Sequence, residues 1–142
     1  MPTEQDRRSA FEALCAVARP RPEIGALAHY LDSSNDFEEL LRLANQHGVQ
    51  PQLVRALGLL GWPQELPASL QQRLKSFQRQ HLLECLVFAD ELCRLADRLE
   101  REGIEMLAFK GPVLALALHG DVAAREYNDI DILVPESKVD AV

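Results

Sequence analysis

The chain has 142 residues, 47% hydrophobic and 26% charged, which is typical of a globular protein and excludes wholesale disorder. Its net charge of −7 argues against a general nucleic-acid binder, because such proteins neutralise phosphates with Lys and Arg. No apolar run reaches the roughly 20 residues of a membrane span, and no secretory signal opens the chain, so we expect a cytoplasmic protein.

Cysteine and histidine form no pattern that predicts a metal site. Cys15, Cys85 and Cys93 lack the paired spacing of metal ligands, and we interpret them as small buried hydrophobic residues. The histidines show neither the HxH nor the HxxxH spacing that would suggest zinc. We therefore assign none of these residues to a metal.

The first part of the chain predicts a series of short helices separated by turns. Asn35 or Asp36 can cap the third of them, and Gly48 is suited to end it. Pro51 stands near the start of the fourth, where proline is tolerated. The four expected ranges are residues 9–18, 23–31, about 36–47 and about 51–60.

The longest uninterrupted pattern runs from Pro67 to about Glu102 and predicts a single long helix. Apolar residues recur there at steps of three and four, which places them on one stripe. Such a helix spans roughly 50 Å, and Gly103 is its expected C′ residue. The stripe includes Leu70, Leu74, Phe77, His81, Cys85 or Phe88, Leu92, Leu95 and Leu99.

After Gly103 the period changes from helix to strand. Residues 104–109 are short and apolar and predict a strand that leads into the turn at 110–112. A helix follows from Pro112 through Leu118, and residues 129–134 predict a second strand. A last helix begins at Pro135. We expect an α+β chain, with a helical region over 1–102 and the first strands of a mixed sheet, incomplete at the C-terminus, over 103–142.

Two carboxylates in the second strand are the strongest chemical signal. Asp129 and Asp131 are one residue apart, so on a strand they point to the same side, with Cα atoms roughly 6–7 Å apart. Ile130 and its alternating apolar neighbours would point into the core. Paired oxygen ligands on a rigid element suit a hard divalent cation such as Mg²⁺. Lys110 and Arg125 could supply positive charge to a phosphate.

The segment GIEMLAFKGPVLALALHGDVAAREYNDIDILV resembles a bacterial nucleotidyltransferase-like family. The signature of that family reads roughly G-I-x-x-x-x-L-K-G-x-x-L, then Y-G-D, an Arg, and D-I-D-x-L-V. The resemblance extends over about residues 36–142 and is sharpest over 103–134. The matching positions are Gly103, Ile104, Lys110, Gly111, Leu114, Gly120, Asp121, Arg125, Asp129, Ile130 and Asp131.

The resemblance implies the start of a polymerase-β-like nucleotidyltransferase fold. In that superfamily a glycine turn approaches the nucleoside triphosphate, and a D-x-D pair binds Mg²⁺ together with a third carboxylate on a later strand. Gly111 matches the turn glycine, and Asp129 and Asp131 match the metal pair. Two features depart from the pattern: Pro112 replaces the usual serine, and the interval from Gly111 to Asp129 is longer.

The resemblance predicts transfer of a nucleoside monophosphate from a Mg-NTP to an unknown acceptor. Asp129 and Asp131 would be the catalytic metal ligands, and Lys110, Gly111 and Arg125 would contact the nucleotide phosphates. The third carboxylate is missing, since Glu136 and Asp140 lie on no predicted strand. We therefore expect the chain to be an N-terminal portion of a longer protein and to be inactive by itself.

Other readings of the same residues remain open. A D-x-D on an edge strand can simply be solvated polar residues, and Arg125 can pair with Glu126 or Asp129 at the surface. The chain can instead be a non-catalytic interaction module that binds a protein partner through the long helix or the open sheet edge. A helix-turn-helix around Gly48 is a further alternative, but Pro51 falls in its recognition helix.

Overall fold

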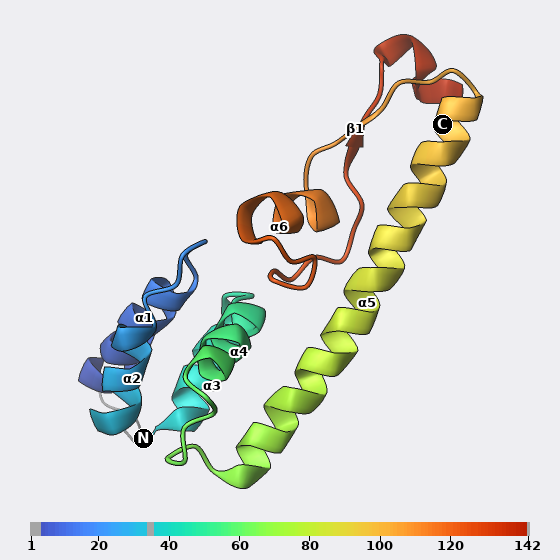
Figure 1. The fold of residues 1–142 in the computed structure, drawn as a ribbon. Coiled ribbons are helices and arrows are strands. Elements are labelled where there is room, and N and C mark those ends of the chain that lie inside the picture. Colours follow the sequence, from blue (N-terminus) through green and yellow to red (C-terminus); the bar gives the residue numbers. More distant parts are fainter. Residues whose placement is uncertain (1–3, 34–35, 142) are drawn as a thin grey trace. The chain divides into compact units, whose positions relative to one another are not determined.

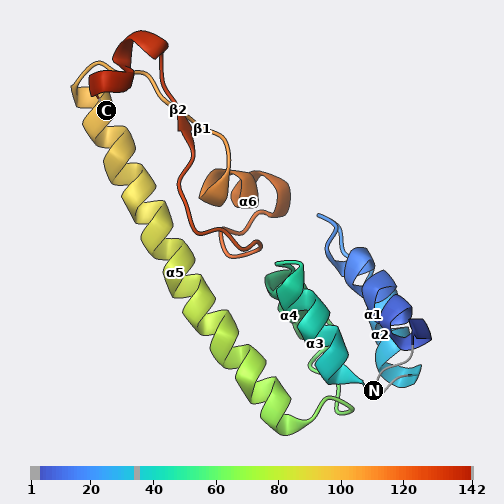
Figure 2. The same ribbon diagram turned by 180° about the vertical axis from the view of Figure 1, so that it is seen from behind.

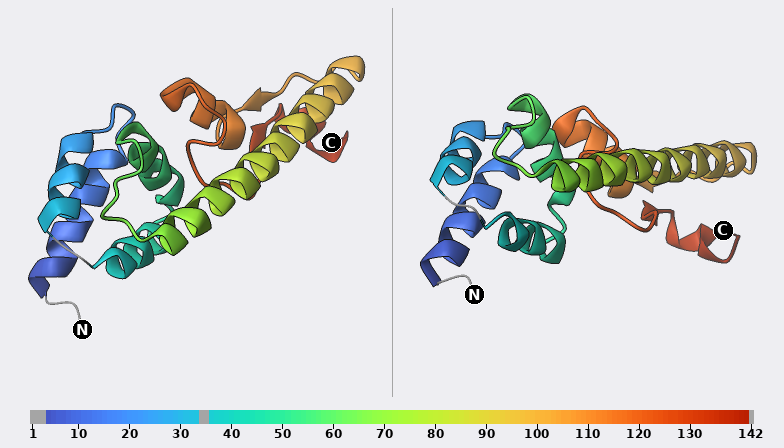
Figure 3. Two further views of the ribbon diagram at one scale, coloured as in Figure 1. Left: turned by 60° about the horizontal axis from the view of Figure 1, so that its bottom comes forward. Right: turned by 90° about the horizontal axis from the view of Figure 1, so that it is seen from below.

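Six α-helices, one 3₁₀ helix and a two-stranded sheet make up the regular structure of residues 4–33 and 36–141, the part of the chain that this computed structural model describes (Figure 1). The chain divides into two compact units, Met1–Gln80 (unit 1) and His81–Val142 (unit 2). The long helix α5 (Ala68–Arg101) belongs to both and runs without a break (Figure 3). The combination of helices with a small sheet confirms the expected α+β class.

Unit 1 is a helical bundle with a continuous apolar core. The core is formed by fully buried side chains from every helix, including Leu27, Leu40, Leu53 and Leu74. The four predicted short helices are confirmed, with ends that differ by a few residues from the expected ranges. They are α1 (Glu4–Val17), α2 (Ile24–Ser33), α3 (Phe37–Gln46) and α4 (Gln50–Leu59).

The ends of α3 are fixed by the residue types that the sequence predicted. Asp36 is the N-cap, and its side chain accepts a hydrogen bond of 3.0 Å from the Glu39 amide. Asn35, the other predicted cap, lies outside the described residues. Gly48 follows the helix with a φ of 63°, a left-handed conformation that favours glycine.

A buried carboxylate links two helices of unit 1. The Glu39 side chain is 5% exposed and accepts two hydrogen bonds of 2.7 Å from the guanidinium of Arg42. Arg7 Nε of α1 lies 3.5 Å from Glu39 Oε1. The Arg42 guanidinium holds the pKa of the Glu39 carboxyl below its ordinary value. Glu39 therefore joins α3 to α1 as an ionised group.

Unit 2 places a small antiparallel sheet beside the second part of α5. Its elements are β1 (Leu107–Ala108), α6 (Gly111–His119), β2 (Ile132–Leu133) and η1 (Glu136–Ala141). The two strands lie side by side (Figure 2), with Leu107 opposite Leu133 and Ala108 opposite Ile132. One more backbone bond, from the Phe109 amide to the Asp131 carbonyl at 3.4 Å, continues the pairing.

Both strands are shorter than the sequence predicted. We expected strands over residues 104–109 and 129–134, whereas pairing covers two residues on each. Asp129 and Asp131 therefore precede β2 instead of lying within it. Each strand has only one neighbour among the described residues, and a two-stranded sheet is marginal by itself. The helix expected after Pro135 is a 3₁₀ helix, η1.

Helix α5 turns one stripe of side chains toward the interior of unit 2. His81, Cys85, Leu92 and Leu99 are buried at steps of four and seven residues, as the periodicity predicted. The helix ends at Arg101, Gly103 follows with a φ of 68°, and the Ile104 amide donates to the Leu99 carbonyl at 2.8 Å. The predicted domain boundary after residue 102 stays a prediction, and the two compact units divide after Gln80.

Candidate functional site

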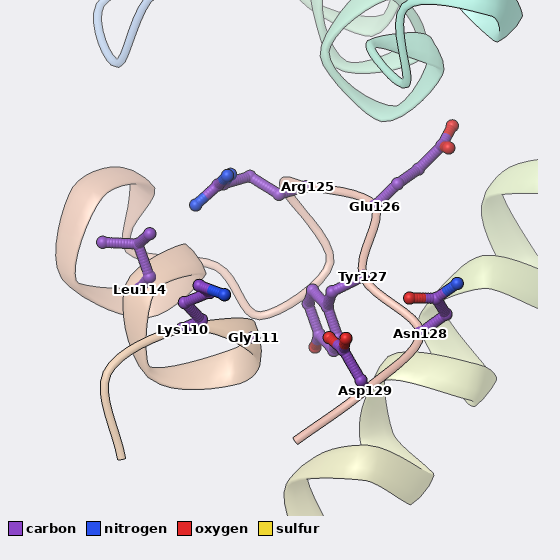
Figure 4. A pocket seen from close by; sticks show the side chains of 8 residues that line it. All are labelled: Lys110, Gly111, Leu114, Arg125, Glu126, Tyr127, Asn128 and Asp129. Atoms are coloured by element: carbon purple, nitrogen blue, oxygen red, sulfur yellow. The ribbon is translucent and has the colours of Figure 1, made fainter. Parts of the chain in front are cut away.

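A pocket of about 210 Å³ lies between the start of α6 and the segment 125–129 (Figure 4). Four of the five predicted site residues, Lys110, Gly111, Arg125 and Asp129, line it, although 14 or more positions separate the two pairs in the sequence. The complete lining is Lys110, Gly111, Leu114, Arg125, Glu126, Tyr127, Asn128 and Asp129. The fifth predicted residue, Asp131, lies two positions farther along and contacts Lys110.

Gly111 is the point at which α6 contacts the segment that leads to β2. Its φ is 56°, and a Cβ at this position would lie 3.3 Å from the Asp129 carbonyl oxygen and 3.8 Å from the Tyr127 ring. Glycine is needed here for both its conformation and its size. The close approach brings the first turn of α6 against the backbone that carries Asp129.

The first turn of α6 presents unpaired backbone donors beside the pocket. Lys110 is the N-cap and makes no side-chain capping hydrogen bond, and Gly111 and Pro112 follow it. The first amides of a helix have no partner within the helix and carry a partial positive charge. Pro112 lacks an N–H, so one of these donors is missing. The remaining amides and the Lys110 ammonium give this end of the pocket a positive character.

Lys110 also approaches the second aspartate. Its Nζ lies 3.4 Å from Asp131 Oδ2, and the Asp131 side chain is 27% exposed. That Oδ2 atom is itself buried and accepts no hydrogen bond from the described residues. Asp129, in contrast, is exposed at the pocket. The two carboxylates therefore stand in different surroundings, one solvated and one held against a cation.

Arg125 reaches the pocket from the opposite wall. Figure 4 shows its guanidinium directed toward α6 and Leu114, while the side chains of Glu126 and Asn128 point away from α6. Within the described ranges Arg125 has no carboxylate within 4.0 Å, so the alternative in which it pairs with Glu126 or Asp129 is not observed. A half-buried guanidinium without a counter-ion is suited to bind an anion.

The segment before Arg125 is fastened to α5. The Asp121 carboxylate accepts a hydrogen bond of 2.9 Å from the Ala123 amide, and the Ala123 carbonyl lies 3.1 Å from His81 Nε2. A carbonyl can only accept, so the proton of His81 is on Nε2 in this contact. Ala124 is 3% exposed. The backbone before Arg125 is therefore held in two places, by the turn at Asp121 and by the contact of Ala123 with His81 of α5.

Tyr127 holds the same segment after Arg125. This residue was not singled out from the sequence. Its hydroxyl donates to the Val122 carbonyl at 2.9 Å, and its ring meets Phe88 edge-on at 5.7 Å. Burial raises the pKa of the Tyr127 hydroxyl, so it remains a neutral donor. Its position two residues before Asp129 was the available signal.

Cys85 lies beside this contact as a buried thiol. Its Sγ is 3.5 Å from His81 Nε2, and burial raises the pKa of the thiol. A buried thiol with a raised pKa holds little of the reactive thiolate. This agrees with the prediction that Cys85 is a buried hydrophobic residue, which its 1% exposure confirms. Cys15 and Cys93, predicted to be buried in the same way, are instead exposed.

The described residues contain no cluster of three or more His, Cys, Asp or Glu side chains that could hold a metal ion. The predicted metal ligands are Asp129, which lines the pocket, and Asp131, which lies beside it. Both are oxygen donors, and the unsatisfied Asp131 oxygen is the kind of atom that a hard cation would complete. The pair therefore fits part of a Mg²⁺ coordination sphere.

No described helix is long and apolar enough to cross a membrane.

Comparison with known proteins identifies the family. Residues 33–142 match a family described as uncharacterised nucleotidyltransferases, a range close to the 36–142 expected from the motif. No curated protein and no solved structure matches the chain. The match covers more than half of the chain and includes every residue of the pocket. The chain therefore belongs to the family of uncharacterised nucleotidyltransferases.

Proposed function

We propose that the pocket binds the phosphates of a Mg-NTP, for transfer of a nucleoside monophosphate to an acceptor. Lys110, the first amides of α6 at Gly111, and Arg125 contact the phosphates. Asp129 and Asp131 hold the metal. The proposal extends the family membership to individual residues, and it includes the polymerase-β-like fold that the motif resembles.

The observation that carries the proposal is a pair of charged groups with incomplete bonding, Arg125 in the pocket wall and Asp131 beside it, where Lys110 lies at 3.4 Å. Arg125 has no carboxylate partner within the described residues, and Asp131 Oδ2 is buried without a hydrogen bond. Unsatisfied charged groups are costly unless a ligand completes them. An anion satisfies the first group and a cation the second. A metal-bound polyphosphate supplies both.

Positive groups on two walls suit an elongated anion. Lys110 and the start of α6 stand on one side, and Arg125 extends toward α6 from the other (Figure 4). Phosphoryl transfer relies mainly on positioning and on neutralising charge, for which fixed donors of this kind are suited. The bound metal would neutralise phosphate oxygens in the same way. The contacts of Tyr127 and His81 hold the segment that carries Arg125 and Asp129.

We propose further that residues 1–142 bind nucleotide without transferring it. The two-metal site of the superfamily needs a third carboxylate, and the described residues contain no group of three that could hold a metal ion. Glu126 also lines the pocket, but its side chain points away from α6 (Figure 4). Two ligands are enough to retain a hydrated Mg²⁺ that borrows phosphate oxygens. Two carboxylates can hold one metal ion, whereas the two-metal mechanism needs ligands for a second.

The test is nucleotide binding by purified residues 1–142, measured by equilibrium dialysis with each labelled NTP in Mg²⁺. We expect binding that falls about tenfold in Arg125→Ala, because a charge-assisted contact is lost. Arg98→Ala, an exposed arginine on α5, is the control and retains full binding. Failure of every NTP to bind would refute the phosphate site.

The same samples test transfer. No labelled product is expected from residues 1–142 with Mg²⁺, including when cell extract is added as a source of acceptors. Product that disappears in Asp129→Ala would overturn the proposed inactivity while supporting the metal role. Product that persists in Asp129→Ala and Asp131→Ala would overturn the role of both carboxylates.

A protein-interaction role is the second candidate. Large hydrophobic side chains with high exposure are concentrated in unit 2, among them Leu83, Val87, Leu107 and Leu133. Exposed apolar side chains that gather in one region mark binding surfaces. The open edges of the β1–β2 sheet are a further place for a partner. This role does not compete with nucleotide binding, since it uses different residues.

A further inference from the structure

Helix α5 carries a second apolar face that nothing in unit 2 covers. Leu82, Leu83, Leu86 and Val87 are exposed, Leu83 by 65% and Val87 by 68%. The buried stripe of the same helix, which includes His81, Cys85 and Leu92, lies about half a turn away. A helix that is apolar on two opposite faces needs a covering element on each.

The exposed face has the spacing of a helix–helix seam. Arg79, Leu83, Leu86 and Asp90 follow one another at steps of four, three and four residues. Residues at these steps occupy the a and d positions of a heptad and face a partner helix. Leu82 and Val87 flank them and widen the apolar strip. The face is therefore shaped for another helix and not for a sheet edge.

The charges at the two ends of this strip select the partner and its direction. Arg79 stands one turn before Leu83, and Asp90 stands one turn after Leu86. When a second α5 runs antiparallel, Leu83 meets Leu86 of the second copy and Arg79 meets Asp90. A parallel, in-register pair would instead place like charges opposite each other, which is unfavourable.

We propose that the chain self-associates through this strip, with two copies of α5 packed antiparallel. The geometry is self-complementary, as a two-fold interface requires, because each copy contributes the same residues to both halves. Asp90 also lies 2.9 Å from Arg94 of its own helix, and both side chains are exposed. That exposed pair is weak and leaves the carboxylate available to Arg79 of the second copy. The inference uses no residue of the nucleotide pocket.

The strip is short, so the association is weak. Two heptads bury less than the roughly 1,200 Å² of a stable interface. We therefore expect a concentration-dependent monomer–dimer equilibrium with a dissociation constant on the order of micromolar to tens of micromolar. The full chain should change its sedimentation coefficient with concentration over that range.

A charge exchange tests both the surface and the direction by analytical ultracentrifugation of the full chain. Arg79→Glu and Asp90→Lys each place like charges opposite one another in an antiparallel dimer. Each variant should dimerise at least tenfold more weakly than the wild type. In an equimolar mixture of the two variants, the heterodimer has opposite charges at both contacts, so association should return to within about threefold of wild type.

Arg98→Glu is the matched control for Arg79→Glu, because it makes the same charge change on an exposed residue of α5 about two turns beyond Asp90. It should dimerise like the wild type. Circular dichroism and thermal melting verify that every variant stays folded, as expected for exposed positions. A wild type that stays monomeric at about ten times the weakest dissociation constant expected above would overturn the proposal. So would a mixture that associates no better than its separate components.

Discussion

Lys110 Nζ lies 3.4 Å from Asp131 Oδ2, a buried oxygen that accepts no hydrogen bond from the described residues. The ammonium therefore neutralises the carboxylate where the proposed metal would bind. A divalent cation and Lys110 would compete for the same oxygen. In the proposed function, binding of the cation would leave the Lys110 ammonium free to contact the phosphates. Such an exchange would couple metal binding to nucleotide binding through one side chain.

Replacing Lys110 should therefore affect metal and nucleotide in opposite directions. Lys110→Met removes the charge but keeps most of the chain volume. We expect Mn²⁺ to bind a few-fold more tightly, because its competitor is gone, and NTP to bind about tenfold more weakly. Electron paramagnetic resonance measures free Mn²⁺, and dialysis measures the nucleotide. A parallel loss of both affinities would contradict the competition.

Gly111→Ala should damage the site through both conformation and space. The φ of 56° costs an L residue about 1 kcal/mol, and the new Cβ would meet the Asp129 carbonyl at 3.3 Å. We expect a loss of about 2 kcal/mol in stability and a large loss of NTP binding. Urea unfolding measures the stability.

Gly120→Ala is the control for that variant. Gly120 has a similar φ of 69° but has nothing within 4 Å of an added Cβ. The Gly120→Ala variant should lose about 1 kcal/mol of folding stability and keep its NTP affinity. Equal effects of the two substitutions on binding would show that the contact between Gly111 and Asp129 is unimportant.

Tyr127→Phe should loosen the segment that carries Arg125 and Asp129. The hydroxyl bond to the Val122 carbonyl is lost while the ring against Phe88 remains. We expect about 1 kcal/mol lower stability and a few-fold weaker NTP binding. Tyr30→Phe removes a similar bond, 3.0 Å to the Asp36 carbonyl, in unit 1. That control should lose comparable stability and leave NTP binding unchanged.

The stability of the chain should depend on pH through Glu39. Its folded-state pKa lies below the ordinary value of 4.5, first because of the hydrogen bonds from Arg42. The stabilisation is thus present above pH 4.5 and is lost as pH falls through the lower folded-state value. Glu39→Gln should lower the melting temperature by several degrees at pH 7, and the gap to wild type should close toward pH 3.

Glu38→Gln provides the comparison for Glu39. Glu38 pairs with Arg73 at 3.3 Å, but its side chain is 74% exposed. Exposed pairs contribute little to stability. The melting temperature of the Glu38→Gln variant should equal that of the wild type at every pH. A Glu39→Gln curve that also follows the wild type would contradict a stabilising role for the buried pair.

Much of the helical structure was predictable because its signals are local. The break at Gly48 and the cap at Asp36 were read from residue type alone, and α5 was read from a period sustained over many turns. The ends of the strands were not predictable, because the length of a strand depends on the strand with which it pairs. The pattern over 129–134 fitted a strand, but only Ile132 and Leu133 are paired.

The sequence by itself determined the order of the elements, the family, and which residues carry charge near the motif. The tertiary structure decided which of those residues meet. Gly111 and Asp129 touch because the chain returns from α6 along a segment held to α5 by His81 and Tyr127. Such contacts join positions far apart in the chain, and no local periodicity encodes them. For the same reason only the structure showed that Arg125 has no counter-ion among residues 4–33 and 36–141 and that Asp131 has Lys110 beside it.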